Sequence, residues 1–135
     1  MCYFWDLLWC FYAGGSAVAE VEVEEFADGL KIRCSGLVTI CPFNREPDYG
    51  EVEIVCKPSK TPISEYKLKE YLDNELEYSK IPMEAVPLKI LTHCMIYNRD
   101  WLREGKQRNI TVNAHFKKKN GSEMLITINF ERKWK

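Results

Sequence analysis

Two stretches in the first half of the chain alternate strictly between apolar and polar residues, which is the pattern of strands with one buried face. The first has its apolar residues at Ile32, Cys34, Val38 and Ile40. Gly36 is a possible β-bulge within it, and Cys41 is expected to leave the strand on the face opposite the core. The second stretch has its apolar residues at Val52, Ile54 and Cys56.

Two further alternating stretches near the C-terminus predict a hairpin. Their apolar residues are Ile110, Val112, Ala114 and Phe116, followed by Met124, Ile126, Ile128 and Phe130. Asn120 and Gly121 lie between the two stretches, and this residue pair is typical of a type I′ turn.

The middle of the chain has helical spacing instead. Ser64 can cap a first helix, whose apolar stripe is Leu68, Tyr71, Leu72 and Leu76. A second helix is expected to begin near Glu84, because Pro82 and Pro87 confine its start, and to continue to Met95. Two strands, two helices and two strands indicate an α+β fold.

The chain has 135 residues, which is the size of one domain with a real core. Its net charge of -1 argues against a protein that binds nucleic acid over its whole surface. The charges are unevenly distributed, however. Residues 99–135 contain 10 basic and 4 acidic residues, against 9 and 16 in residues 1–98. Such asymmetry indicates a polyanionic partner for the C-terminal third.

Six cysteines are scattered through the chain without a Cys-x-x-Cys pair, which argues against a structural metal site. A disulfide framework is not expected either. Residues 1–29 are set apart as an N-terminal extension, either non-native or part of an interface, and residues 30–135 as the single domain. The apolar run at residues 1–12 is too short to cross a bilayer as a helix, and no lysine or arginine precedes it as a secretory signal requires. We therefore expect a cytoplasmic protein.

The segment from Cys41 to Gly50 carries the candidate chemistry. Cys41 and Asp48 lie seven residues apart in a loop stiffened by Pro42 and Pro47. A thiol held near a carboxylate can act as a nucleophile with a proton-transfer partner. The alternative is a buried structural cysteine and an aspartate that serves only a turn.

This loop, the strand after it and the helix beginning near Ser64 together resemble the tunnel-fold family of 7-cyano-7-deazaguanine reductases and their archaeal QueF-like relatives. The likeness covers about Ile32 to Met95. The resemblance implies a tunnel fold, with a four-stranded antiparallel sheet, two helices on one face, and assembly into a ring, commonly a pentamer or stacked pentamers.

The helix start departs from the reductases. They carry a motif of the form Glu-Ser-Lys-Ser-hydrophobic-Lys-Leu-Tyr that holds the nicotinamide cofactor. The residues here run from Ser64 to Tyr71, and only Leu68, Lys69 and Tyr71 agree. In this departure the chain resembles the QueF-like archaeosine synthases, which keep the thiol chemistry and lack the hydride donor. It implies an amidinotransferase that converts 7-cyano-7-deazaguanine in tRNA to archaeosine through a Cys41 thioimide, without a cofactor and with ammonia as nitrogen donor.

The resemblance also implies a substrate site. Asp48 would shuttle protons, while Ile63, Ser64 and Glu65 match the family's substrate-contacting turn. Glu84 lies near the sequence position at which the family has a glutamate that binds the base. A carboxylate can accept the paired N–H donors of that base. Helix capping by Ser64 and a dipole interaction of Glu84 are the structural alternatives.

Basic residues near the C-terminus are candidates for tRNA binding: Lys117, Lys118, Lys119, Arg132 and Lys133. A lysine-rich hairpin tip can instead serve only solubility and edge protection. Two other functions remain open. One is an NADPH-dependent 7-cyano-7-deazaguanine reductase, and the other is a non-catalytic tunnel-fold binding protein.

Overall fold

The computed structural model describes residues 20–26, 29–57, 65–105 and 109–131. Five strands form one antiparallel sheet in the order β2-β3-β4-β5-β6. Their bounds are Glu20–Phe26 (β2), Gly29–Ile40 (β3), Pro47–Lys57 (β4), Asn109–Lys118 (β5) and Glu123–Glu131 (β6). The expectation of four strands is therefore wrong, because β2 pairs with β3 from Glu20 opposite Ser35 to Phe26 opposite Gly29.

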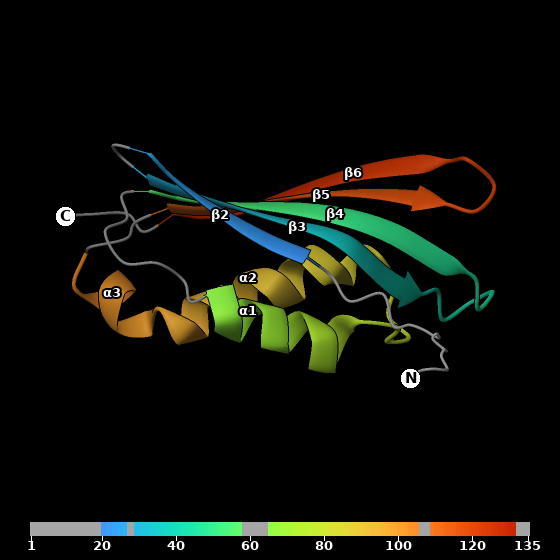
Figure 1. Ribbon diagram of the computed structural model, residues 1–135, viewed down its shortest axis with the longest axis horizontal. Helices are drawn as coiled ribbons and strands as arrows, with labels where there is room; N and C mark the ends of the chain where they lie inside the picture. The colour runs from blue at the N-terminus through green and yellow to red at the C-terminus, as the bar shows by residue number, and fades with distance from the viewer. Residues whose placement is uncertain (1–19, 27–28, 58–64, 106–108, 132–135) are drawn as a thin grey trace, which may run out of the picture.

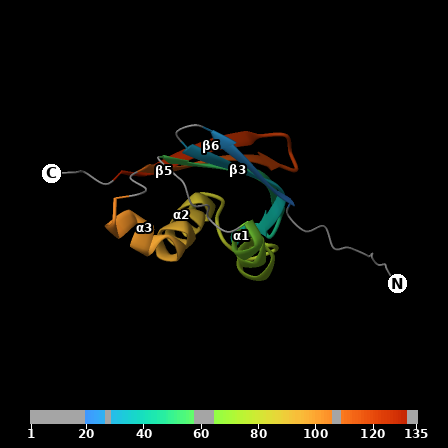
Figure 2. The same cartoon turned by 60° about the vertical axis from the view of Figure 1, so that its left-hand side comes forward.

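The helices lie between β4 and β5 in sequence and cover one face of the sheet, as both views show (Figure 1 and Figure 2). They are α1 (Glu65–Tyr71), which continues as a π-helical segment, η1 (Leu72–Leu76), then α2 (Ala85–Tyr97) and the short α3 (Arg99–Arg103). The two expected helices are confirmed, and α3 is an addition to them. The result is a two-layer α+β fold.

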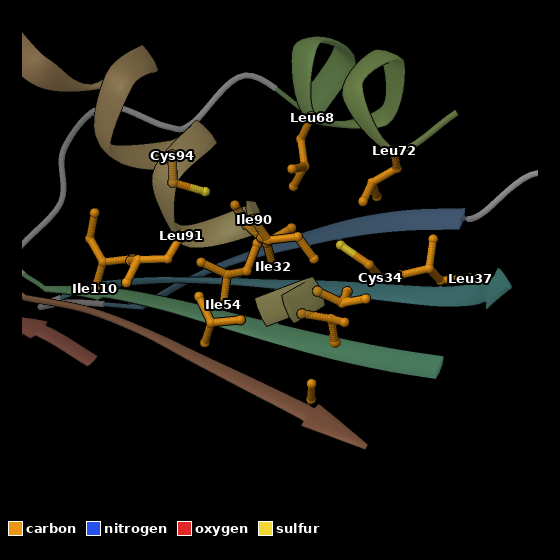
Figure 3. Packing of buried hydrophobic residues seen from close by; sticks show 14 of the residues in the cluster. Ile32, Cys34, Leu37, Ile54, Leu68, Leu72, Ile90, Leu91, Cys94 and Ile110 are labelled. Atoms are coloured by element: carbon orange, nitrogen blue, oxygen red, sulfur yellow. The ribbon is translucent and has the colours of Figure 1, made fainter. Parts of the chain in front are cut away.

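The core fills the space between the helices and the sheet (Figure 3). Leu68, Leu72 and Leu76 recur at a spacing of four residues and are all buried, so the predicted stripe of the first helix faces the sheet. The expected alternation of β5 is also confirmed. Its even-numbered residues Ile110 to Phe116 are buried against the helices.

The turn of the last hairpin differs from the expected type I′. That turn needs positive φ at both central residues, but Arg45 and Tyr78 are the only described residues other than glycine with positive φ. Instead Gly121, at φ 94, donates its N–H to Lys118, whose own N–H is donated to Ser122. This is the arrangement of a three-residue hairpin loop with a glycine bulge.

Candidate functional site

A β-bulge decides on which face the candidate nucleophile lies. Cys34 pairs with Val52 but Leu37 pairs with Gly50, so β3 contains one extra residue here, and Gly36 has a φ of 78°. The extra residue reverses the alternation that follows. Leu37, Thr39 and Cys41 therefore face the helices and are buried, with Cys41 only 8% exposed. Our expectation that Cys41 leaves the strand opposite the core is wrong for this reason.

The loop that carries Cys41 is closed by short backbone hydrogen bonds. Cys41 donates its N–H to the carbonyl of Glu46 at 2.9 Å and accepts the N–H of Arg45 at 2.8 Å. Arg45 adopts a φ of 63°, and the side chain of Asn44 accepts the N–H of Glu46 at 3.0 Å. The loop therefore fixes the thiol at the end of β3 and the start of β4.

Asp48 lies on the same face of the sheet as Cys41. It pairs with Thr39 on β3 and with Lys118 on β5. Because Cys41 continues the ladder opposite Glu46, it is a diagonal neighbour of Asp48, and such neighbours have Cβ atoms roughly 7 Å apart. The structure thus brings the two predicted catalytic residues to one end of the helix-facing side of the sheet.

The Asp48 carboxylate is 1% exposed and has two different oxygens. Oδ1 accepts a hydrogen bond from Lys118 Nζ at 3.1 Å. Oδ2 is buried and has no hydrogen-bond partner among the described residues, and the same is true of the neighbouring Thr39 hydroxyl. A buried carboxylate oxygen without a partner carries a large desolvation cost and requires an explanation, and a catalytic role is one of those that apply to such groups.

Lys118 was expected to face RNA, but its ammonium is held at this site. The hydrogen bond to Asp48 raises the pKa of Lys118, and the nearby Cys41 and Glu84 raise it further. Lys118 is therefore a cation close to all three acidic members of the candidate site. Sequence alternation could have placed it on the core face with Phe116, but the run of three lysines concealed this signal.

Glu84 reaches the same neighbourhood from the helical layer. It is the N-cap residue of α2, with no side-chain hydrogen bond to the helix, and its side chain is exposed. A capping role for this carboxylate is therefore not supported by a hydrogen bond. The preceding Met83 is 5% exposed and packs in the core.

The chain between η1 and α2 packs directly against the end of β3. Ile40 donates its N–H to Ser79, Tyr78 donates its N–H to Val38, and Ile40 forms a parallel bridge with Lys80. Glu77 accepts the N–H of Val38 at 3.4 Å. Burial raises the pKa of Glu77 to about 7, and the nearby Asp73 raises it as well. This segment buttresses the strand that presents Cys41, and sequence patterns gave no indication of it.

Other predicted residues are spread over the molecule. Ile63, Ser64, Arg132 and Lys133 lie outside the described residues. Glu65 is the exposed first residue of α1, and Lys117 and Lys119 are exposed on the last hairpin. Lys117 projects from the face of the sheet opposite Lys118, since the two are adjacent in β5.

The other cysteines and the histidines of the described residues have structural surroundings. Burial raises the pKa of Cys34 and of Cys56 to about 12, and it also raises the pKa of Cys94 well above its usual value. These thiols are inert core residues. His115 contacts Glu123 at 2.6 Å, and His93 stacks on Tyr71 with ring centroids 4.2 Å apart. Within the described residues, no cluster of three or more His, Cys, Asp or Glu could hold a metal ion.

Two shallow hollows lie on the opposite face of the sheet, with volumes of about 320 and 370 Å³. Glu51 and His115 line both, and neither is lined by Cys41, Asp48 or Lys118. The described helices are all too short or too polar to span a membrane.

No family model matches the sequence, and no curated protein matches it. Among solved structures, the chain is similar to the crystal structure of the archaeosine synthase QueF-Like in the apo form. The match has a TM-score of 0.59 and 17% sequence identity, and covers 76% of this chain and 90% of that chain. At this identity the likeness concerns the fold. The α+β arrangement that presents Cys41, Asp48 and Lys118 is therefore similar in fold to that archaeosine synthase.

Proposed function

We propose that this protein is a tRNA-modifying amidinotransferase that converts the nitrile of 7-cyano-7-deazaguanine to an amidine. The observation that carries the proposal is the location of Cys41 and of the unpartnered Asp48 Oδ2 at one end of the sheet. The fold shared with an archaeosine synthase supports it. A nucleophile beside a proton-transfer group is what addition to a nitrile requires.

In the proposed reaction, the sulfur of Cys41 forms a bond to the nitrile carbon, and the nitrile nitrogen receives the thiol proton through Asp48. The product of this step is a thioimide. Ammonia then attacks the same carbon, the C–S bond breaks, and the leaving thiolate takes up a proton that the attacking nitrogen releases. The overall reaction converts a nitrile and ammonia to an amidine, with no change in oxidation state and no cofactor.

Substrate binding would draw on Glu84, whose carboxylate can accept the paired N–H donors of the 2-aminopyrimidinone edge. Ile63, Ser64 and Glu65 would contact the base from the start of α1. We also propose that chains assemble into a ring through β2 and β6, which are the edges of the described sheet. The expected working place is the cytoplasm, where the tRNA is.

The second candidate is the nicotinamide-dependent nitrile reductase. Leu68, Lys69 and Tyr71 are its only motif residues here, and each has a structural contact. Leu68 is buried in the core, Lys69 Nζ contacts Asp73 at 3.1 Å, and the Tyr71 hydroxyl donates to the Lys89 carbonyl at 3.4 Å. These three residues thus have structural contacts within the domain, so their presence does not by itself indicate a nicotinamide site.

Mass spectrometry of the intact protein with 7-cyano-7-deazaguanine tests the proposal. We expect an adduct of the mass of the nitrile base on the wild type and on Cys34→Ala, and none on Cys41→Ala. Ammonium should release the amidine from the adduct, while NADPH should not be consumed. An adduct that survives in Cys41→Ala would refute the nucleophile, and NADPH consumption would favour the reductase.

A further inference from the structure

Lys118 supplies the cation of the candidate site, although the charge pattern of the sequence had made it a candidate for tRNA binding. Lys118 lies two positions after Phe116 on the core face of β5, opposite Asp48 on β4. Its side chain is 29% exposed, whereas Asp48 is 1% exposed. The pair therefore lies at the boundary between core and solvent, where a ligand can reach it.

The two oxygens of the Asp48 carboxylate have different surroundings. Lys118 Nζ occupies Oδ1 at 3.1 Å, while Oδ2 has no partner among the described residues. A hydrogen bond from an ammonium to a carboxylate is charge-assisted and therefore strong, so it holds Oδ1 at the Lys118 side. Oδ2 is then held in one orientation and is available for proton transfer.

The same ammonium lies on the face of the sheet that carries the thiol, since Lys118 pairs with Asp48 and Cys41 is the diagonal neighbour of Asp48. Three groups influence Lys118 from three parts of the fold: Asp48 on β4, Cys41 in the loop after β3, and Glu84 at the start of α2. A positive charge beside a cysteine favours its thiolate, which is the nucleophilic form.

We propose that Lys118 is a positioning residue of the site: it orients Asp48 through Oδ1, leaves Oδ2 to exchange the proton, and places a positive charge on the face of the sheet where Cys41 lies. The proposal rests on the proposed function for the identity of the substrate, but the effect on the thiol is independent of that substrate.

Iodoacetamide alkylation of Cys41, followed by peptide mass mapping across pH, measures this effect directly. Cys2 and Cys10 are replaced by serine in every variant. The core thiols of Cys34, Cys56 and Cys94 are expected to react little with iodoacetamide, because burial raises their pKa. We expect Lys118→Met to slow alkylation at neutral pH about tenfold and to move the profile to higher pH, as removal of a close unit charge does. Lys118→Arg should restore most of the rate.

Lys117→Met is the matched control, since it removes the same charge one residue away on the opposite face. A purely structural Lys118 would give the reverse result, because a loosened loop would expose Cys41 and speed its alkylation. Equal rates for Lys118→Met and Lys117→Met, or a faster rate for Lys118→Met, would overturn the proposal.

Lys118→Met leaves a buried carboxylate unpaired and can fail to fold. For that case, Asp48→Asn is compared with Asp48→Asn/Lys118→Met, in which no unpaired carboxylate remains. The double variant should be alkylated several-fold more slowly than the single one, and equal rates would overturn the proposal. Absence of a nitrile adduct on the wild type would refute the amidinotransferase while leaving the alkylation result on Lys118 unaffected.

Discussion

Replacing Gly50 by alanine tests how the sheet holds Asp48 in place. Gly50 lies two residues after Asp48 on the core face of β4 and pairs with Phe116 on β5. A Cβ atom at Gly50 would lie 2.6 Å from Cε1 and 2.9 Å from Cδ1 of Phe116. The Phe116 ring is fully buried, so it cannot move away into solvent.

The expected cost follows from this overlap. Accommodating an extra methyl group in a packed core typically costs about 1–3 kcal/mol, because side chains leave their rotamers and the backbone shifts. For a domain of this size, such a loss lowers the melting temperature by about 4–12 °C. The displaced ring would lie next to Asp48 and Lys118, so nitrile adduct formation should slow as well.

Urea unfolding of Gly50→Ala, Phe116→Leu and the double variant measures the coupling. Leucine lacks the ring atoms that the new methyl group would meet, so the double variant should be more stable than the sum of the single effects by about 1 kcal/mol or more. Additive effects would show that the methyl group is accommodated without moving Phe116, and the reasoning from this contact would then be wrong.

Three further predictions concern proton transfer, RNA binding and pH. Asp48→Asn should slow turnover about a hundredfold or more if Oδ2 transfers the proton; a near-normal rate would reduce Asp48 to a structural residue. The double variant Lys117→Met/Lys119→Met should bind tRNA more weakly and with a smaller salt dependence, without a change in nitrile adduct formation. An unchanged salt dependence would mean that both lysines serve only solubility. The pKa of Glu77 is raised to about 7 by burial, so the folded state binds more protons than the unfolded state above about pH 4.5 and stability falls as pH rises to 7. Glu77→Gln should remove this loss, seen as a smaller difference in melting temperature between pH 5 and pH 8, and an unchanged difference would contradict the assignment.

The parts of the fold that depend on local periodicity were predictable. The Leu68 to Leu76 stripe, the start of α2 near Glu84 and the alternation of β5 all follow from residue spacing, and the structure confirms them. The strand Glu20–Phe26 was missed because only Val21 and Val23 mark its inner face, both partly buried at the edge of the sheet. Its many glutamates concealed the alternation.

The site was predicted only in part, since its members depend on register rather than on composition. Gly36 was recognised as a possible bulge, but the consequence that one extra residue transfers Cys41 to the other face needs the pairing partners on β4. Lys118 joins Asp48 across two strands, a contact that no local pattern encodes. The run of basic residues around it favoured a surface role.

The pairing of Asp48 with Lys118 also has a consequence for how the site comes into being. The two residues are 70 positions apart, so their contact forms only when β5 has paired with β4. A growing chain that has emerged as far as α3 already contains Cys41 and Asp48 but lacks the cation. Contacts of such sequence separation form slowly, because a long loop must close first. If Lys118 acts on the site as proposed, full reactivity of Cys41 develops only once the last hairpin has paired with β4, and alkylation of this thiol would then measure completion of the fold.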